Sequence, residues 1–198
     1  MKIGLTGGIA TGKTTVAAML VERGAMLVDA DQVAREVVMP GEPALEAVAS
    51  AFGQAVIHTD GTLDRKALGG IVFNNRDLLA KLENILHPAI RNRMQHRIRQ
   101  YEEQNPRQLV VADIPLLFET GQEMLYDGIM VAYVPRELQL KRLMERNGLA
   151  EEEAERRIGL QMDIEQKRSR ADWIIDNSGS LDETRRQVDD FWNIKGLP

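Results

Sequence analysis

The chain begins with MKIGLTGGIATGKTTVAAML, in which glycines and a lysine separate two apolar runs. This stretch fits the phosphate-loop pattern G-x-x-x-x-G-K-[ST] at Gly7, Gly12, Lys13 and Thr14. The pattern has structural meaning only where a strand precedes it and a helix follows it. Residues 3–5 supply the strand and residues 16–21 the helix. The start of the chain therefore predicts a strand–loop–helix unit that binds phosphate.

Each residue type in this loop suits a phosphate ligand. Glycines let backbone N–H groups turn inward around phosphate oxygens, and the N-terminus of the next helix adds a favourable dipole. Lys13 can reach β- and γ-phosphates, and the Thr14 hydroxyl can ligate Mg²⁺. A plain glycine-rich turn would leave the lysine unexplained.

Composition narrows the classes of protein. A chain of 198 residues with 43% hydrophobic and 28% charged residues is typical of one soluble globular domain, with room for inserted lobes. There are no cysteines, which excludes disulfides and thiolate metal sites. No apolar run approaches the roughly 18 residues of a membrane span. A net charge of −5 argues against sequence-independent nucleic-acid binding. We expect a cytoplasmic enzyme or switch with no membrane or nucleic-acid partner.

Five short segments rich in Val, Ile and Leu read as strands, and helical stretches separate them. They are residues 2–7, 25–31, 108–114, 128–134 and 172–176. Apolar strands that alternate with helices indicate an α/β fold with a five-stranded parallel sheet covered on both faces. Such sheets bind ligands at the carboxyl ends of their strands, so the phosphate loop and residues 29–31 should lie at that edge.

Two excursions interrupt this core, which we assign to residues 1–31, 106–140 and 171–198. About seventy residues separate the second and third strands, far more than one crossover helix requires. Residues 32–105 therefore read as an inserted helical lobe, in which Pro88 is expected to begin a helix and not to lie inside one. The charged residues 141–170 read as a second excursion, a lid over the site.

Three carboxylates are candidates for the chemistry. Asp29 and Asp31 follow the second strand in DADQVAR. Transfer of a phosphoryl group to an alcohol benefits from a carboxylate that orients the hydroxyl and accepts its proton, and one of this pair suits that role. The other could meet Mg²⁺-bound water or cap the next helix. Asp113 ends the third strand, where it is either a metal-associated carboxylate or part of a rigid turn with Pro115.

Basic side chains supply the complementary candidates. Gln139, Arg142 and Arg146 are spaced to share one helical face, where guanidinium groups could close over a transferring phosphoryl group. Arg157 is equally well read as part of a solvated helix. The arginines at 91, 93, 97 and 99 are better read as solvated than as a substrate site. The three histidines lack metal-ligand spacing.

Taken in order along the chain, these segments resemble the dephospho-coenzyme A kinase family. The resemblance covers nearly the whole chain. It rests on LTGGIATGKTTVA, VDADQVAREVVMPGEPAL, GTLDRKALGGIVF, LENILHPAI, IPLLFE, QLKRLMERNGL, RIGLQ and ADWIIDNSGS. It implies a P-loop kinase of the nucleoside-monophosphate-kinase type, with a five-stranded core, a helical substrate lobe and a lid. The implied reaction moves the ATP γ-phosphoryl group to the 3′-hydroxyl of dephospho-CoA, with Mg²⁺.

The resemblance also implies roles for single residues. Asp31 is the implied base, with Lys13 and Arg142 beside it as catalytic groups. The implied ATP contacts are Gly7, Gly8, Ala10, Thr11, Gly12, Lys13, Thr14, Thr15, Arg142, Arg146, Asn177 and Gly179. Asp31, Arg65 and His87 are the implied substrate contacts, Thr14 the metal ligand, and Arg157 a further lid arginine.

Two departures from the family pattern and two alternatives remain. Members of the family vary at the position of Asp113, which weakens any essential role for it. The family loop usually reads GSGKS, whereas here it reads ATGKT, so we expect Ala10 to need no glycine-like backbone freedom. A second enzyme reading is another nucleotide kinase with the same core and lobes. A nucleotide-dependent switch is a third reading, but the chain has no N-K-x-D guanine motif, and a switch leaves an arginine-bearing lid without purpose.

Overall fold

A five-stranded sheet lies at the centre of the computed structural model, which describes all residues from Met1 to Pro198. The strands are β1 (Lys2–Gly7), β2 (Met26–Asp29), β3 (Val110–Asp113), β4 (Ile129–Tyr133) and β5 (Trp173–Asp176). Their spatial order is β2-β3-β1-β4-β5, and β1 pairs in parallel with both β3 and β4. The α/β class and all five expected strands are confirmed.

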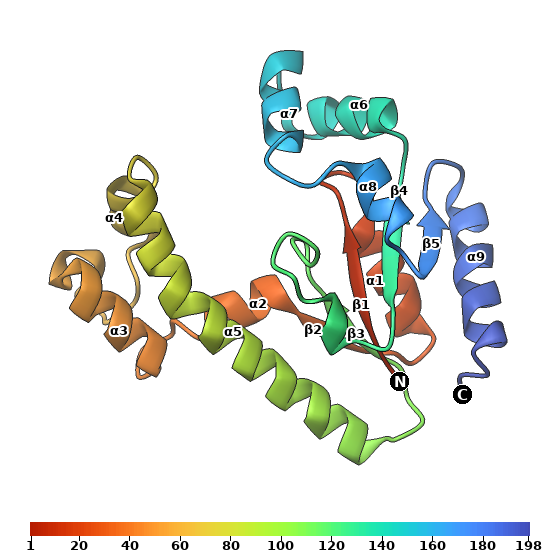
Figure 1. Cartoon of the computed structure of the whole chain (residues 1–198), viewed down its shortest axis with the longest axis horizontal. Helices are drawn as coiled ribbons and strands as arrows, with labels where there is room; N and C mark the ends of the chain where they lie inside the picture. The colour runs from red at the N-terminus through yellow and green to blue at the C-terminus, as the bar shows by residue number, and fades with distance from the viewer. The chain divides into compact units, whose positions relative to one another are not determined.

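Helices occupy the connections (Figure 1). They are α1 (Lys13–Glu22), α2 (Ala30–Glu36), α3 (Pro43–Phe52), α4 (Arg65–Val72), α5 (Arg76–Gln104), α6 (Arg136–Asn147), α7 (Glu151–Ile158), α8 (Ile164–Ser169) and α9 (Leu181–Ile194). Short 3₁₀ turns lie at Gln54–Val56 and Glu123–Leu125. None of the helices combines the length and apolar character needed to cross a bilayer.

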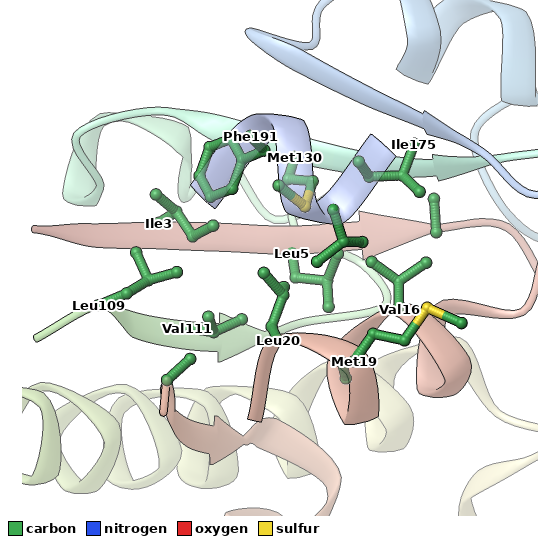
Figure 2. Close-up of a cluster of buried hydrophobic side chains, with 14 of the residues drawn as sticks. Ile3, Leu5, Val16, Met19, Leu20, Leu109, Val111, Met130, Ile175 and Phe191 are labelled. Carbon is green, nitrogen blue, oxygen red and sulfur yellow. The ribbon is translucent and has the colours of Figure 1, made fainter. Parts of the chain in front are cut away.

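The main core lies between the sheet and the helices α1 and α9. Ile3 and Leu5 point from β1 toward Val16 and Leu20 of α1, and Phe191 of α9 completes the layer (Figure 2). Gly4 faces the opposite side of β1, as the two-residue period of a strand requires. A Cβ there would collide with Leu117, Ile129 and Tyr126, so apolar side chains also cover that face. This double burial explains the near-continuous apolar sequence of the strands.

The chain divides into two compact units, Met1–Val28 with Ile98–Pro198, and Asp29–Arg97. The second unit corresponds to the expected lobe of residues 32–105, but it begins and ends earlier. Its end falls inside a continuous helix, α5, which belongs to both units. The lobe has its own apolar cluster, built on Val48, Val56, Leu68 and Val72.

The expectation that Pro88 begins a helix was wrong. Pro88 lies inside α5, which runs unbroken from Arg76 to Gln104. Proline cannot donate to the carbonyl of Asn84, four residues earlier. Both Pro88 and Asn84 are exposed, so water can satisfy that carbonyl, and the helix continues.

The second excursion contains three helices. The chain leaves β4, passes through α6, α7 and α8, and returns to β5 (Figure 1). Leu143, Ala154 and Ile158 form its buried centre, against which Ile9 and Ala10 of the phosphate loop also pack. These helices begin at Arg136, earlier than the expected lid of residues 141–170. The lid helices and the phosphate loop therefore share one apolar cluster.

Candidate active site

The phosphate loop connects β1 to α1 and ends in a set of unpaired backbone donors. Thr11 is fully buried and stabilises the turn, because its hydroxyl donates to the Gly8 carbonyl at 2.9 Å. The backbone N–H groups of Ala10, Gly12, Lys13 and Thr14 make no hydrogen bond within the protein. Unpaired N–H groups at a helix N-terminus form an anion-binding site.

Three glycines of the loop are required by close neighbours. A Cβ at Gly7 would lie 2.7 Å from the Thr11 hydroxyl, and one at Gly8 would overlap the side-chain amide of Gln139. Gly12 has a φ of 83°, and a Cβ there would overlap Asn177. The loop is thus closely packed against its neighbours at these three positions.

The expectation for Ala10 was wrong. Ala10 has a φ of 62° and is the only residue other than glycine in the left-handed region. For a residue with a Cβ this backbone costs roughly 1–2 kcal/mol. This position therefore requires a backbone conformation that glycine adopts readily. Here the residue is alanine, and the surrounding structure holds it in that conformation.

Lys13 and Asp113 form an ion pair at the carboxyl ends of β1 and β3. Both side chains are largely buried, with exposed fractions of 16% and 8%. The sequence left Asp113 open between a metal-associated carboxylate and part of a rigid turn. The structure directs its carboxylate at the loop lysine, so Asp113 belongs to the phosphate site.

The residues present fit a magnesium ion bound jointly with phosphates. Thr14 is exposed and its hydroxyl makes no hydrogen bond within the protein, while Asp113 supplies a carboxylate on the neighbouring strand. No group of three or more histidine, aspartate and glutamate side chains could hold a metal ion unaided. Magnesium commonly takes one or two protein oxygens and completes its shell with phosphate oxygens and water.

A cavity of about 620 Å³ opens beside the loop. Many of the residues expected to bind ATP line it: Ala10, Gly12, Thr15, Arg142, Arg146, Asn177 and Gly179. Arg142 donates to the backbone carbonyl of Asn177 at 3.0 Å, which joins α6 to the segment after β5. Arg146 is exposed on the next turn of α6, where it bonds only to Asn147. The structure thus brings residues far apart in sequence to one side of the phosphate loop.

The buried side chain of Asn177 links the phosphate loop to helix α9. Its side-chain Nδ2 donates to the Thr11 carbonyl at 2.9 Å, and its Oδ1 accepts from the Thr184 hydroxyl at 2.9 Å. These contacts use the side-chain amide of Asn177 to support the phosphate loop.

Two further side chains that sequence reasoning missed also support the loop. Lys167 of α8 is fully buried, pairs with Glu119 at 2.9 Å and donates to the Pro115 carbonyl at 2.8 Å. Burial lowers the pKa of the Lys167 ammonium and Lys13 acts in the same direction, whereas Glu119 opposes both. Gln161 accepts a hydrogen bond from the backbone of Ile9. The only signal for Lys167 is its spacing of three residues from the buried Ile164, which is weak in so charged a segment.

The remaining candidates lie in the lobe. Asp29 is the N-cap of α2 and accepts from the N–H groups of Asp31 and Gln32, so the capping alternative is confirmed. Asp31, in the first turn of α2, is exposed, and its carboxylate makes no hydrogen bond or ion pair. Arg65 begins α4 and His87 lies on α5; both are exposed.

Arg91, Arg99 and Arg157 are exposed, as the solvated reading predicts. Arg93 and Arg97 are half-buried and ion-paired, so that reading was wrong for these two. Arg157 pairs with Glu153 at 3.0 Å along the surface of α7 and does not line the cavity. In the lobe, Arg93 pairs with Glu42 and Arg97 with Glu36, each at 2.7 Å. These pairs join α5 to the residues at the beginning of the lobe.

A parallel sheet with a phosphate loop, a loop lysine and arginines on a helix beside the loop is typical of P-loop kinases. Comparison with known proteins identifies the family. The model of the dephospho-CoA kinase family matches residues 1–183. The dephospho-CoA kinase of Halalkalibacterium halodurans is 50% identical over 197 residues, which are 98% of each chain.

Two solved structures are similar to this chain over nearly its whole length. TT1252 from Thermus thermophilus is 36% identical, with a TM-score of 0.81 over 98% of this chain and 97% of that one. The dephospho-CoA kinase of Campylobacter jejuni is 32% identical, with a TM-score of 0.69 over 98% and 96% of the two chains. The chain belongs to the dephospho-CoA kinase family, which confirms the resemblance. It is an ATP-dependent kinase of the last step of coenzyme A synthesis.

Proposed function

We propose that Asp31 is the general base when the chain transfers the γ-phosphoryl group of ATP to the 3′-hydroxyl of dephospho-CoA. The hydroxyl oxygen forms a bond to the γ-phosphorus, and the bond from that phosphorus to the β–γ bridging oxygen breaks. ADP leaves with the electron pair, and the hydroxyl proton passes to the carboxylate. The exposure of Asp31 and its lack of any protein partner support this role.

In the proposed reaction the phosphate loop binds ATP, the donor of the phosphoryl group. The unpaired N–H groups of Ala10, Gly12, Lys13 and Thr14 would bind the β- and γ-phosphate oxygens, and the Lys13 ammonium would neutralise their charge. This set of free donors beside a lysine is the observation that carries the proposed function. Asp113 holds the ammonium group of Lys13 at the end of β1.

Magnesium would be held by the Thr14 hydroxyl and, directly or through water, by Asp113. When bound, it would neutralise charge on the β- and γ-phosphates as the phosphoryl group transfers. The residues of this chain then have to hold the phosphates in line with the acceptor hydroxyl and to exclude water.

Two arginines of α6 supply the remaining hydrogen-bond donors to the phosphates. Arg142 and Arg146 lie one turn apart on α6 and line the cavity that opens beside the loop. In the proposed complex their guanidinium groups meet charge on the phosphates and exclude water that would hydrolyse ATP. Asn177 and Gly179, which line the same cavity, would border the adenine.

Arg65 and His87 are the proposed acceptor contacts. Both side chains are exposed, and neither makes a hydrogen bond or ion pair with the rest of the protein. The guanidinium group of Arg65 suits the phosphates of dephospho-CoA, and the imidazole of His87 can hydrogen-bond to the substrate. We propose that the enzyme acts in the cytoplasm with this small molecule as its partner.

The test is ADP release with ATP and Mg²⁺, with dephospho-CoA compared with AMP, CMP, adenosine and no acceptor. We expect a strong response to dephospho-CoA alone, with coenzyme A as the product. Dephospho-CoA that lacks its 3′-hydroxyl is the matched control and should give only background release.

Two results would contradict the acceptor assignment. A stronger response to a nucleotide would make the chain a sister kinase with the same fold and phosphate loop. Slow ATP hydrolysis that is indifferent to every acceptor would favour a nucleotide-dependent switch.

A further inference from the structure

The phosphate loop contains a backbone conformation that its own sequence does not favour. Ala10 has a φ of 62°, in the region that residues with a Cβ avoid. Such a conformation persists only where the surrounding structure over-determines it. The contacts around Ala10 should therefore include groups whose role is to hold this turn.

Two glutamine side chains hold the residue immediately before Ala10. The N–H of Ile9 donates to Oε1 of Gln161 at 2.7 Å, and the carbonyl of Ile9 accepts from Nε2 of Gln139 at 2.8 Å. We call Gln139 and Gln161 the glutamine clamp. Both members come from the lid segment: Gln139 lies on α6 and Gln161 between α7 and α8.

Packing alone does not account for a glutamine at position 139. The residue is 2% exposed, and its Oε1 is buried without a hydrogen-bond partner. A buried, unpaired oxygen destabilises a protein, and an apolar side chain of similar length would avoid it. The feature that an apolar side chain could not reproduce is the bond from Nε2 to the Ile9 carbonyl.

The position of the clamp links it to phosphate binding. The carbonyl it holds belongs to the Ile9–Ala10 peptide, whose N–H is the first of the unpaired donors. The two groups of a peptide point in opposite directions, so a carbonyl fixed toward Gln139 directs the Ala10 N–H the other way. The apolar cluster of the lid, which Ile9 and Ala10 also join, holds the same peptide from its side chains.

We propose that Gln139 and Gln161 are positioning residues for phosphoryl transfer. Together they hold the left-handed turn at Ala10 and so aim the loop donors at the ATP phosphates. Because both come from the lid segment, the geometry of the phosphate loop depends on the placement of the lid helices. This inference rests on the phosphate-binding role proposed for the loop.

The test replaces each clamp residue with methionine, which keeps the length of the side chain but cannot make the bond. Gln166→Met, on the exposed surface of α8, is the matched control because the Gln166 side chain makes no hydrogen bond. Titration calorimetry with a non-hydrolysable ATP analogue measures the affinity directly. It needs no acceptor, so failure of the acceptor assignment would leave this readout intact.

We expect Gln139→Met and Gln161→Met each to weaken ATP-analogue binding by about tenfold, the effect of one lost hydrogen bond. The KM for dephospho-CoA should stay within about twofold of the original value. The double variant should lose less than the product of the single losses, because both residues hold the backbone of the same residue, Ile9. Gln166→Met should bind like the unaltered protein.

The substitution Ala10→Gly distinguishes a positioning role of the glutamine clamp from a general effect of the clamp on folding. A glycine adopts the left-handed turn without the clamp, so Ala10→Gly should restore about fivefold of the affinity lost in Gln161→Met. The affinity of Ala10→Gly alone is measured as the reference for this rescue. A defect in folding would not be corrected by a change at the loop.

Two results would overturn the proposal: unchanged ATP-analogue affinity in Gln161→Met, or a loss of affinity that Ala10→Gly does not restore. Melting temperatures are measured for every variant. If Gln139→Met does not fold, Gln161→Met, whose side chain is only half-buried, decides the question together with its Ala10→Gly partner.

Discussion

The phosphate loop and the helical lobe present their candidate functional residues in opposite ways. In the loop, Thr11 is buried, and side chains from the lid and from the segment after β5 hold the backbone from outside. In the lobe, Asp31, Arg65 and His87 are exposed and make no side-chain hydrogen bond or ion pair. The donor side is thus preorganised by buried hydrogen bonds, whereas the acceptor side keeps its groups free to meet a substrate.

The largest effect should follow a change at Lys13. Lys13→Ala removes the cation from the loop and leaves Asp113, its largely buried partner, without this ammonium. We expect kcat to fall by about 10³-fold and ATP affinity by about tenfold or more. Steady-state kinetics and calorimetry with an ATP analogue measure the two effects. Lys141→Ala, at an exposed position of α6, is the control.

The corresponding change on the acceptor side should act on turnover alone. Asp31→Asn keeps the shape of the side chain but cannot take the hydroxyl proton, so kcat should fall by about 10²–10³-fold. ATP affinity should remain within about twofold, because nothing in the loop depends on Asp31. If Asp31→Asn and Lys13→Ala weaken ATP binding equally, the role assigned to Asp31 is refuted and the contrast between the two regions disappears.

A smaller effect should follow the loss of one supporting hydrogen bond. Thr184→Val removes the hydroxyl that donates to Oδ1 of Asn177 and leaves that oxygen buried and unpaired. We expect the free energy of unfolding to fall by about 1–2 kcal/mol and ATP affinity by a few-fold. Thermal unfolding and calorimetry measure both. The exposed Thr59→Val should change neither, and a loss of stability with full ATP affinity would show that Asn177 does not support the loop.

The smallest effect concerns the charge pairs of the lobe. Hydrogen bonding and charge attraction from Arg97 hold the pKa of Glu36 below its usual 4.5, so the pair stabilises the fold above that pH. The contribution is lost as the pH falls through the lowered pKa. Glu36→Gln should therefore lower the free energy of unfolding by about 0.5–1 kcal/mol at neutral pH, and by less in acid. Urea unfolding at pH 7 and pH 3 measures the difference, and an equal loss at both pH values would contradict this assignment.

The sequence was sufficient for those parts of the molecule that depend on local pattern. The five apolar strands and the phosphate loop follow from the spacing of apolar residues, glycines and charges. Asp29 as a helix cap also follows from its position just before α2. These features need no knowledge of distant contacts.

The features that were wrong or missed depend on contacts made far along the chain. The left-handed Ala10 is held by Gln139 and Gln161, and no local rule indicates that a glutamine after residue 130 will hold residue 9. Pro88 remains inside α5 because exposure lets water satisfy the freed carbonyl. Lys167 appears in sequence as one charge among many, yet it is fully buried.

The contact between Gly8 and Gln139 has a consequence for how this family can vary. The backbone of Gly8 is not in the left-handed region, so its conformation alone would permit other residues. The amide of Gln139 occupies the space of a Cβ at that position, and the Thr11 methyl group would lie 3.4 Å from it. The two positions are therefore epistatic: a larger residue at 8 becomes acceptable only after 139 has become smaller. The phosphate-loop pattern spans eight consecutive residues, but its second position is constrained by residue 139, which lies 131 positions downstream. We expect positions 8 and 139 to covary in an alignment of the family.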